Sequence, residues 1–260
     1  MSRKGASISL GKRLRTCPSF KCLGVVPNWD DYSDADRQTI FEAEKVHYPT
    51  ALYEDVFLSL GKEVFPRNSC RFIGSKIRQT ALFQFLGIPH PKTRLYYGAN
   101  RAARICADFR YPFIAKTPTG SSMGTGVYLI KNEHDLAEYL DQHLPAFIQE
   151  YLDIDKDLRV VIIAGRPVHA YWRIHCAGEF RNNVSRGAEI SYENIAREAL
   201  DFAAGVALRC RFDEVGLDIC ILDGRYYVIE ANMVYGLEGF RRVGLNPYAI
   251  LAGLDREGLL

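Results

Sequence analysis

The segment PFIAKTPTGSSMGTGVYLI, residues 112–130, places a glycine- and serine-rich loop between two short apolar runs, and Lys116 ends the first run. A Walker loop would close on Gly-Lys-Ser or Gly-Lys-Thr, and both it and a dinucleotide-binding loop would lead into a helix. Here the loop leads into residues 127–130, a β-branched and aromatic run. The segment therefore predicts two paired strands joined by a loop from Thr117 to Thr125.

The composition of this loop suits an anion. Gly120, Gly124 and Gly126 tolerate positive φ, so that backbone N–H groups can turn toward one ligand, and Lys116 adds a positive charge beside them. An ordinary long hairpin loop would have the same composition. The segment alone leaves both interpretations open, and other parts of the chain have to decide between them.

Composition narrows the class of protein. The chain has 260 residues, 48% of them hydrophobic, which is enough to bury one large core or two smaller ones that share a cleft. No apolar run reaches the roughly 18 residues of a membrane span, and no signal-peptide pattern follows the basic N-terminus, so we expect a cytoplasmic protein that acts without a membrane. The formal net charge of +2 gives no reason to expect a nucleic-acid partner.

Apolar spacing and turn residues predict a mixed α and β chain with mostly antiparallel sheets. Helices are expected at about 34–46, 51–61, 73–86, 99–108, 133–143 and 193–210. Strands are expected at about 93–97, 113–116, 127–130, 146–151, 157–164, 167–171, 215–222 and 225–232. Before residue 73 the pattern offers one clear strand candidate, at 22–26.

The strongest chemical signal lies in the hairpin of residues 215–232. The two-residue period of a strand puts Glu230 and Asn232 on one face, and Asp218 lies on the partner strand among apolar residues. Burying that carboxylate is costly unless a metal or a positive group compensates it. Two carboxylates and an amide oxygen are hard ligands of the kind Mg²⁺ prefers. A polar face that looks into solvent is the alternative.

The turn of this hairpin conflicts with such a metal site. A two-residue Asp223-Gly224 turn would pair residue 222 with 225 and hence Asp218 with Ile229, which sends Glu230 to the opposite face. We expect the metal site to prevail, through an odd number of loop residues or a β-bulge near the turn, because two carboxylates would otherwise lack compensating charge.

Short motifs from Ile73 to the C-terminus agree in order and spacing with one family. They are Ser75-Lys76-Ile77-Arg78, Leu86-Gly87-Ile88-Pro89-His90-Pro91-Lys92-Thr93, Lys116 with its glycine loop, Gln149-Glu150-Tyr151, Asp157-Leu158-Arg159, Gly178-Glu179-Phe180-Arg181-Asn182-Asn183, Arg186-Gly187, Gly216-Leu217-Asp218-Ile219 and Val228-Ile229-Glu230-Ala231-Asn232. Together they resemble the ATP-grasp fold, in its RimK-type glutamate ligase branch. The resemblance implies an α+β fold in which two α/β subdomains with mostly antiparallel sheets clasp ATP. Residues 73–260 would be the ATP-grasp domain, with a small lid subdomain at about 93–149 and a large metal-binding subdomain at about 150–260.

The resemblance also assigns roles to the matching residues. Lys76 and Lys116 would contact the ATP phosphates, and the loop that holds Gly120 and Gly124 would close over them. The other expected ATP contacts are Glu150 and Tyr151 at the adenine hinge, Asp157 at the ribose, and Arg181, Asn182 and Asn183 at the triphosphate. Asp218, Glu230 and Asn232 would hold two Mg²⁺ ions, or Mn²⁺. Arg173 would act with Lys116 in catalysis by facing the reacting acyl group. Ordinary solvated carboxylates remain the alternative for Glu150 and Asp157.

The activity that the resemblance implies is an ATP-dependent carboxylate–amine ligase. A substrate carboxylate would attack the γ-phosphorus of ATP, and an amine would then attack the acylphosphate to give an amide. The implied partners are a small-molecule or peptide acid and an amine, such as glutamate or another amino acid, and an oligomer is left open. The other hypothesis is a nucleotide-binding regulatory module that keeps the ATP pocket without turnover.

The chain departs from the family pattern in two places. The usual N-x-SPGLEG sequence is here Asn232-Met233-Val234-Tyr235-Gly236-Leu237-Glu238-Gly239, so that Val234 and Tyr235 replace a serine-proline pair. RimK-type ligases also carry an α/β domain ahead of the ATP-grasp core, whereas only 72 residues precede Ile73. Residues 1–72 are therefore expected to form a shortened substrate-side segment, and the identity of the substrates stays open.

Overall fold

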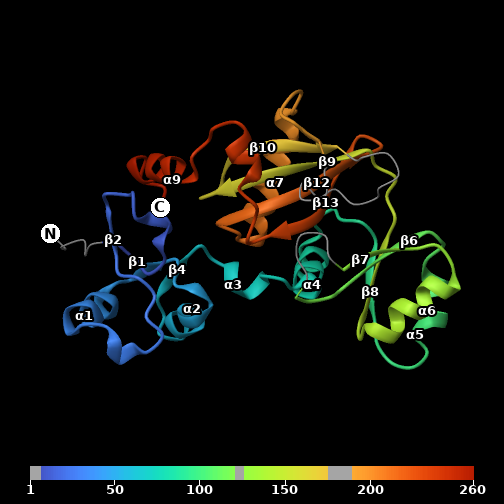
Figure 1. Cartoon of the computed structure of the whole chain (residues 1–260), viewed down its shortest axis with the longest axis horizontal. Coiled ribbons are helices and arrows are strands. Elements are labelled where there is room, and N and C mark those ends of the chain that lie inside the picture. The colour runs from blue at the N-terminus through green and yellow to red at the C-terminus, as the bar shows by residue number, and fades with distance from the viewer. Residues whose placement is uncertain (1–6, 121–125, 175–188) are drawn as a thin grey trace.

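The computed structural model describes residues 7–120, 126–174 and 189–260. These residues form three β-sheets with helices packed against them (Figure 1). The N-terminal sheet and the green sheet of the middle of the chain lie at opposite ends of the long axis, and the third sheet lies above and between them. No helix among these residues has the length and apolar character to cross a membrane.

The N-terminal sheet is parallel and has four very short strands. In the order β2-β1-β3-β4, these are β2 (Phe20–Cys22), β1 (Ser7–Ser9), β3 (Lys45–His47) and β4 (Glu63–Phe65). The helical elements of this part are η1 (Lys12–Leu14), η2 (Trp29–Asp31), α1 (Asp34–Glu42) and α2 (Thr50–Ser59). The expectation of one strand at 22–26 was wrong, and the helix expected to reach residue 46 stops at Glu42. Strands of three residues are too short for a two-residue period to show in the sequence.

The helix expected at 73–86 begins only at Lys76, and a separate short helix precedes it. α3 (Ser69–Phe72) and α4 (Lys76–Leu86) are separated by Gly74, whose φ of +62° suits glycine. Ser75 then caps α4 because its side chain accepts a hydrogen bond from the backbone N–H of Arg78. The break places Lys76 in the first turn of a helix, where a side chain can reach forward past the helix end.

The second sheet is antiparallel, in the order β5-β8-β6-β7. Its strands are β5 (Thr93–Tyr96), β6 (Phe113–Lys116), β7 (Val127–Ile130) and β8 (Ala146–Glu150), and its helices are α5 (Arg101–Asp108) and α6 (Glu133–Gln142). The predicted hairpin is confirmed, since Lys116 pairs with Val127. Phe113 and Ala115 pack into the core beneath the two helices, so strand alternation turns Lys116 to the other face.

The third sheet is antiparallel as well, in the order β11-β10-β9-β12-β13. Its strands are β9 (Lys156–Ile163), β10 (Arg166–Ile174), β11 (Glu189–Ser191), β12 (Glu214–Leu222) and β13 (Arg225–Asn232). α7 (Arg197–Cys210) covers one face, where Leu158, Leu217 and Val228 join its core. The opposite face carries the intervening residues of each strand, and five candidate site residues are among them, namely Asp157, Arg173, Asp218, Glu230 and Asn232.

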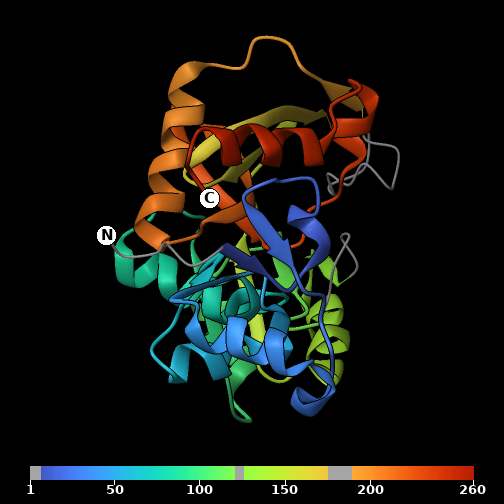
Figure 2. The same cartoon turned by 90° about the vertical axis from the view of Figure 1, so that its left-hand side faces the viewer.

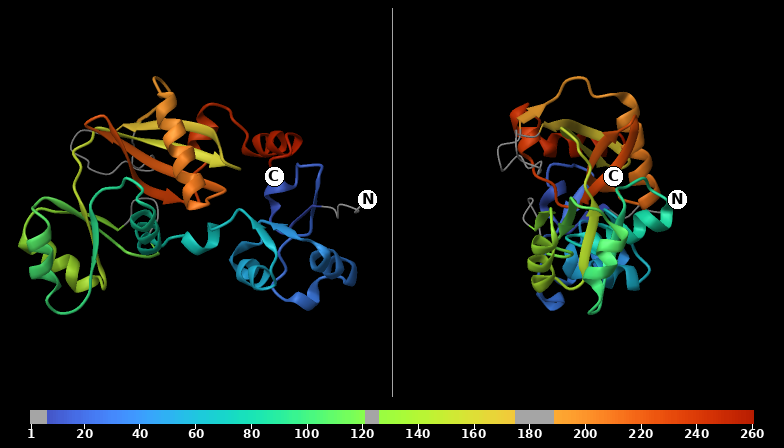
Figure 3. Two further views of the ribbon diagram at one scale, coloured as in Figure 1. Left: turned by 180° about the vertical axis from the view of Figure 1, so that it is seen from behind. Right: turned by 90° about the vertical axis from the view of Figure 1, so that its right-hand side faces the viewer.

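The N-terminal segment and the C-terminal helices cover one part of that opposite face. α8 (Glu238–Arg242) and α9 (Pro247–Arg256) contribute Phe240 and Leu251 to a core with Val161 and Ile163 of β9, and Leu14 of η1 joins it. Figures 2 and 3 show α9, in red, beside the blue N-terminal strands. The polar part of the same face therefore lies next to the N-terminal segment.

Candidate functional site

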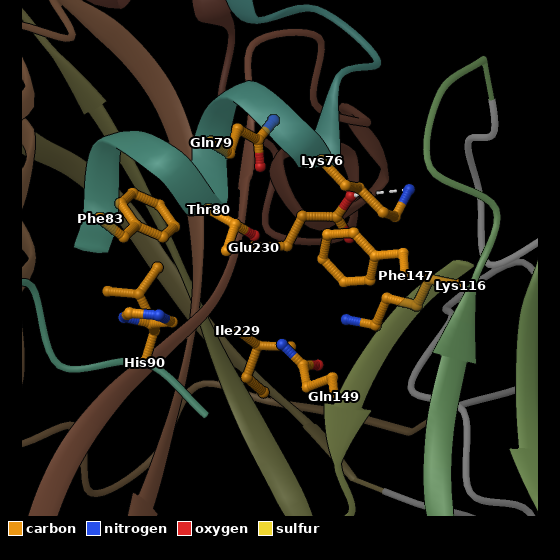
Figure 4. A pocket seen from close by; sticks show the side chains of 11 residues that line it. Lys76, Gln79, Thr80, Phe83, His90, Lys116, Phe147, Gln149, Ile229 and Glu230 are labelled. Carbon is orange, nitrogen blue, oxygen red and sulfur yellow. Dashed lines mark ion pairs between the residues drawn. The ribbon is translucent and has the colours of Figure 1, made fainter. Parts of the chain in front are cut away.

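A pocket lies between the two antiparallel sheets (Figure 4). It encloses about 300 Å³, part of it open to solvent, and α4, β6, β8 and β13 line it. Lys116 and Gln149 enter it from the second sheet, while Lys76 of α4 and Glu230 of β13 face them from the other side. Side chains that the sequence separates by more than a hundred residues thus meet in one cleft.

Two buried lysines give this cleft a positive character. Lys76 is 7% exposed and Lys116 is 6% exposed, and the Nζ of Lys76 lies 3.5 Å from Oε1 of Glu230. Burial lowers the pKa of Lys116, the charge of Lys76 lowers it further, and the carboxylates of Glu230 and Asp218 partly offset both effects. An anion bound between the two lysines would relieve this cost of burial, as the phosphates of a nucleotide would.

The glycine-rich loop begins against α4. The backbone N–H of Gly120 donates to the carbonyl of Gly74 at 3.0 Å, and the N–H of Lys76 donates to the carbonyl of Pro118 at 3.1 Å. Gly120 has a φ of +73°, the conformation for which a glycine was expected. These bonds hold the start of the loop beside Lys76. Gly124 lies outside the described residues, so its predicted contact stays a prediction.

The predicted metal ligands share one face of the β12–β13 hairpin. Asp218 lies directly opposite Glu230, and Gly216 opposite Asn232. A β-bulge makes this possible, because the register shifts between the pairs Ile219↔Val228 and Asp218↔Glu230. The expectation of a β-bulge that places Asp218 and Glu230 on one face is confirmed, while metal binding there stays a prediction.

The position of the bulge differs from the expectation. The two-residue turn is kept, with φ of 49° at Asp223 and 72° at Gly224, and regular pairs follow it from Leu222↔Arg225 to Ile219↔Val228. The extra residue is Ile229, which lines the pocket instead of continuing the strand alternation. The hairpin therefore keeps its two-residue turn and still has Asp218 and Glu230 on one face. The bulged residue adds an apolar side chain to the lining of the cleft.

Asp218 is the centre of a buried charge cluster. Arg159 pairs with it through Nε and, at 3.1 Å, through Nη2, while the Nη2 of Arg173 lies 3.0 Å from its Oδ2. Asn232 Nδ2 donates to the same Oδ2 at 3.1 Å. Burial raises the pKa of Asp218, but the charges of Arg159 and Arg173 outweigh it and lower the pKa below its usual range. Asp218 is therefore an ionised carboxylate.

Arg173 is held from its other side by Asp157. Its Nε lies 2.6 Å from Oδ1 and its Nη2 lies 2.8 Å from Oδ2, so the two side chains form a two-bond fork. Both residues are buried, on directly opposed positions of β9 and β10. The ribose contact expected of Asp157 is not tested, whereas its pairing with Arg173 is plain.

Arg159 was given no role from the sequence, although it belongs to the motif Asp157-Leu158-Arg159. Leu158 packs under α7, so the two-residue period already puts Asp157 and Arg159 together on the opposite face. Asp218 lies directly across from Arg159 on the neighbouring strand. Strand alternation was the signal that could have found this residue.

The donor set fits a hard divalent cation. Within the described residues, no group of three or more His, Cys, Asp or Glu side chains is placed to hold a metal ion, so the ligands would be two carboxylates and one amide oxygen. Directly opposed residues such as Asp218 and Glu230 have Cβ atoms about 4.5–5.5 Å apart. The amide nitrogen of Asn232 donates to Asp218 and to the carbonyl of Gly216, which turns its Oδ1 away from them. Carboxylate and amide oxygens are donors of the type that Mg²⁺ prefers, and a cation bound at Asp218 would displace bonds that Arg159, Arg173 and Asn232 make to it.

The predicted hinge residues, Glu150 and Tyr151, lie at the end of β8 and directly after it. The backbone N–H of Glu150 donates to the carbonyl of Lys92 at 2.9 Å, and its Oε1 accepts from the N–H of Lys92 at 2.5 Å. The hydroxyl of Tyr151 donates to Asp153 at 3.4 Å. Glu150 thus fixes the connector that leads into β5, and the adenine contacts of both hinge residues stay predictions. Arg181, Asn182 and Asn183 lie outside the described residues.

Comparisons with known proteins agree with the fold. A family model described as a RimK-like ATP-grasp domain matches residues 74–252. The coenzyme gamma-F420-2:alpha-L-glutamate ligase of Methanococcus maripaludis is 28% identical over 180 residues, covering 66% of this chain and 62% of the relative. The ribosomal protein bS6–L-glutamate ligase of Salmonella paratyphi B is 30% identical over 176 residues, covering 64% of this chain and 58% of the relative.

A solved structure extends the likeness to nearly the whole chain. The ATP-grasp ligase PsnB, in complex with a minimal precursor, Mg and ADP, superposes with a TM-score of 0.64 over 99% of each chain at 16% identity. At that identity the match shows the ATP-grasp fold. The chain spans 62% and 58% of the lengths of the two curated relatives.

Proposed function

This chain belongs to the RimK-like ATP-grasp family, and we propose that it is an ATP-dependent ligase that joins a carboxylate to an amine. The observation that carries the proposal is that Lys76, Lys116 and Glu230 line one cleft between two antiparallel sheets, with the carboxylate of Asp218 near enough to raise the pKa of Lys116. The curated relatives named above are glutamate ligases, which makes glutamate the first amine to test. The acid would be a small molecule or a peptide.

Mg²⁺-ATP would occupy the cleft with its phosphates toward the lysines. Lys76, Lys116 and the backbone at Gly120 would hold the phosphate oxygens, and Asp218 with Glu230 and Asn232 would hold two Mg²⁺ ions, or Mn²⁺. In this proposal residues 73–260 form the ATP-grasp domain, with the lid at 93–149 and the metal-binding part at 150–260. Residues 1–72 border the polar face and would serve the substrate side.

The chemistry follows from the charges in the cleft. Transfer of the γ-phosphoryl group brings two anions together, because the attacking group is a carboxylate, so the cleft must offer more positive than negative charge. Mg²⁺ bound at the carboxylates would neutralise phosphate charge. Arg173, fixed between Asp157 and Asp218, would face the acyl group and steady the oxyanion that forms when the amine attacks. The departing phosphate leaves an amide bond, and no side-chain nucleophile is needed.

The decisive experiment measures ADP release with pooled carboxylates and amino acids, followed by product masses. We expect ADP only in the presence of an acid and an amine, and a product mass equal to their sum less one water. Saturating Mg²⁺-ATP should also raise the melting temperature, because it binds the folded chain alone. Lys116→Ala should lose most of that rise, whereas Lys131→Ala, at an exposed position, should keep it.

Two results would count against the proposal. If saturating Mg²⁺-ATP leaves the melting temperature unchanged, the proposed nucleotide site is refuted. If the chain binds the nucleotide but releases no ADP and forms no coupled product with any of the pooled substrates, the proposed ligase activity is refuted. The chain would then be a nucleotide-binding module.

A further inference from the structure

The buried side-chain amide of Gln79 joins the helix that carries Lys76 to β13, the strand that carries Glu230. We propose that Gln79 is a positioning residue, which sets the spacing between Lys76 and the end of β13 that would bind Mg²⁺. The inference rests on the proposed function, since the phosphates are assigned to Lys76 and a metal ion to Glu230 there.

The amide of Gln79 occupies the outer edge of the third sheet. β13 is the last strand of this sheet, and among the described residues no strand pairs with its other edge. At that edge, Nε2 of Gln79 donates to the carbonyl of Ala231 at 2.7 Å, and Oε1 accepts from the N–H of Ala231 at 3.2 Å. Nε2 also donates to the carbonyl of Phe72, at the end of α3, at 3.2 Å. The amide thus uses both of its donors and its acceptor, and it takes the place of a neighbouring strand at Ala231.

The residue that Gln79 holds lies between two of the predicted metal ligands. Ala231 follows Glu230 and precedes Asn232 on β13. On the other side of the β-bulge, the N–H of Val228 donates at 2.9 Å to the carbonyl of Pro89, in the connector that follows α4. Glu230 therefore lies between two points at which β13 is attached to α4 and its connector, and these attachments fix its position relative to the helix.

Lys76 is placed by the same helix. It precedes Gln79 by three residues, which is one turn on the same face of α4, and the two residues are 7% and 5% exposed. Nζ of Lys76 lies 3.5 Å from Oε1 of Glu230 (Figure 4). A phosphate held by this lysine and by a metal ion at Glu230 requires the two groups to keep a fixed separation. The bonds from Gln79 to Ala231 supply that constraint.

The test compares Gln79→Met, which keeps the length of the side chain but removes the amide, with Gln142→Met at an exposed position of α6. Titration calorimetry gives the dissociation constant for Mg²⁺-ATP. This constant should rise roughly 10–100-fold in Gln79→Met and stay within about twofold of the wild-type value in the control. A side chain that only stabilises the fold would lower the melting temperature without changing this affinity at a temperature where both chains are folded.

A double-mutant cycle with Lys76→Met tests how Gln79 acts. The spacing matters only while the lysine is present, so Gln79→Met should weaken Mg²⁺-ATP binding by less than about twofold in the Lys76→Met background. Losses that multiply in the double variant would show that Gln79 acts independently of Lys76, and they would overturn the inference. A wild-type dissociation constant in Gln79→Met would overturn it as well.

Melting curves without nucleotide show which variants fold. If Gln79→Met does not fold, Gln79→Glu takes its place in the cycle, because the ionised carboxylate keeps an acceptor for the N–H of Ala231 but has no donor for the carbonyl. A wild-type chain that binds Mg²⁺-ATP but forms no amide refutes the proposed ligase activity alone, and the cycle then still decides the role of Gln79. A wild-type chain that binds no nucleotide refutes both.

Discussion

Tyr235, which stands where the family has a serine-proline pair, ties the N-terminal segment to the third sheet. Its hydroxyl donates to Oε1 of Glu214 at 2.7 Å, and the hydroxyl of Tyr48 donates to Oε2 at 2.7 Å. Arg13 pairs with the same carboxylate, which is 4% exposed. Burial and the charge of Glu214 raise the pKa of Tyr235 above its usual range, so its hydroxyl remains a donor. Tyr235→Phe removes the hydroxyl, and with it both this donated bond and the bond that the hydroxyl accepts from Nη2 of Arg13 at 3.2 Å.

The expected loss can be worked out from these contacts. A hydrogen bond to a buried charge contributes about 1.5–3 kcal/mol to the free energy of unfolding. Arg13 still compensates the same oxygen in the variant, which places the loss at the lower end, about 1.5–2 kcal/mol. For a chain of this size each kcal/mol shifts the melting temperature by roughly 2–4 °C. Tyr235→Phe should therefore melt about 3–8 °C below the wild type.

Scanning calorimetry of the whole chain measures this difference. Tyr97→Phe is the matched control, because the same atom is removed from a side chain that is 56% exposed, and it should change the melting temperature little. Were Tyr235→Phe to stay within about 0.5 kcal/mol of the wild type, the hydroxyl would not stabilise the contact between the two parts. An equal loss in both variants would equally refute the argument.

Two further predictions concern His47 and Ile229. Burial and the nearby charge of Lys45 lower the pKa of His47 to about 4, below the value of about 6.5 in an unfolded chain. The unfolded chain therefore takes up a proton first as the pH falls, and about 2 kcal/mol of the free energy of unfolding should be lost between pH 7.5 and 5. Urea unfolding at both pH values measures this loss, which should be smaller by about that amount in His47→Phe. An unchanged loss in the variant would contradict the assignment. Deleting Ile229 should leave a regular hairpin with Glu230 still opposite Asp218, but it removes a side chain that lines the pocket. The chain should therefore fold and show a smaller rise in melting temperature with Mg²⁺-ATP. Ile229→Ala, which keeps the bulge, is the comparison, and a deletion variant that does not fold would show that the bulge itself is required.

Long strands with one buried face make much of this molecule predictable from its sequence. Leu158 and Leu217 have to face a core, so the two-residue period alone assigns their polar neighbours to the other side of the sheet. The same rule, applied to Asp218 and Glu230, reveals the conflict with the turn and requires a bulge. Pattern is informative wherever an element is long enough to repeat it.

Short elements and contacts between distant segments were not predictable in this way. The N-terminal strands have three residues each, and Gly74, at positive φ, delays the start of the helix expected at 73–86 until Lys76. Bonds such as that between Tyr48 and Glu214 join residues 166 positions apart, so no local pattern marks them. The sequence showed that Tyr235 departs from the family without showing what it contacts.

Gly216 explains how the charge cluster and the N-terminal contact fit on one strand. A Cβ atom at this position would lie 2.9 Å from Cβ of Tyr235 and 3.3 Å from Cδ of Arg159, closer than packed carbon atoms normally approach. Glycine at this position lets Arg159 run along the sheet to Asp218 while Tyr235 packs above it and reaches Glu214. Glu214, Gly216 and Asp218 alternate on one face of β12, so the carboxylate that the N-terminal segment contacts and the carboxylate that would bind the metal lie four residues apart on a single strand. One strand thereby joins the segment proposed to serve the substrate side to the proposed metal site.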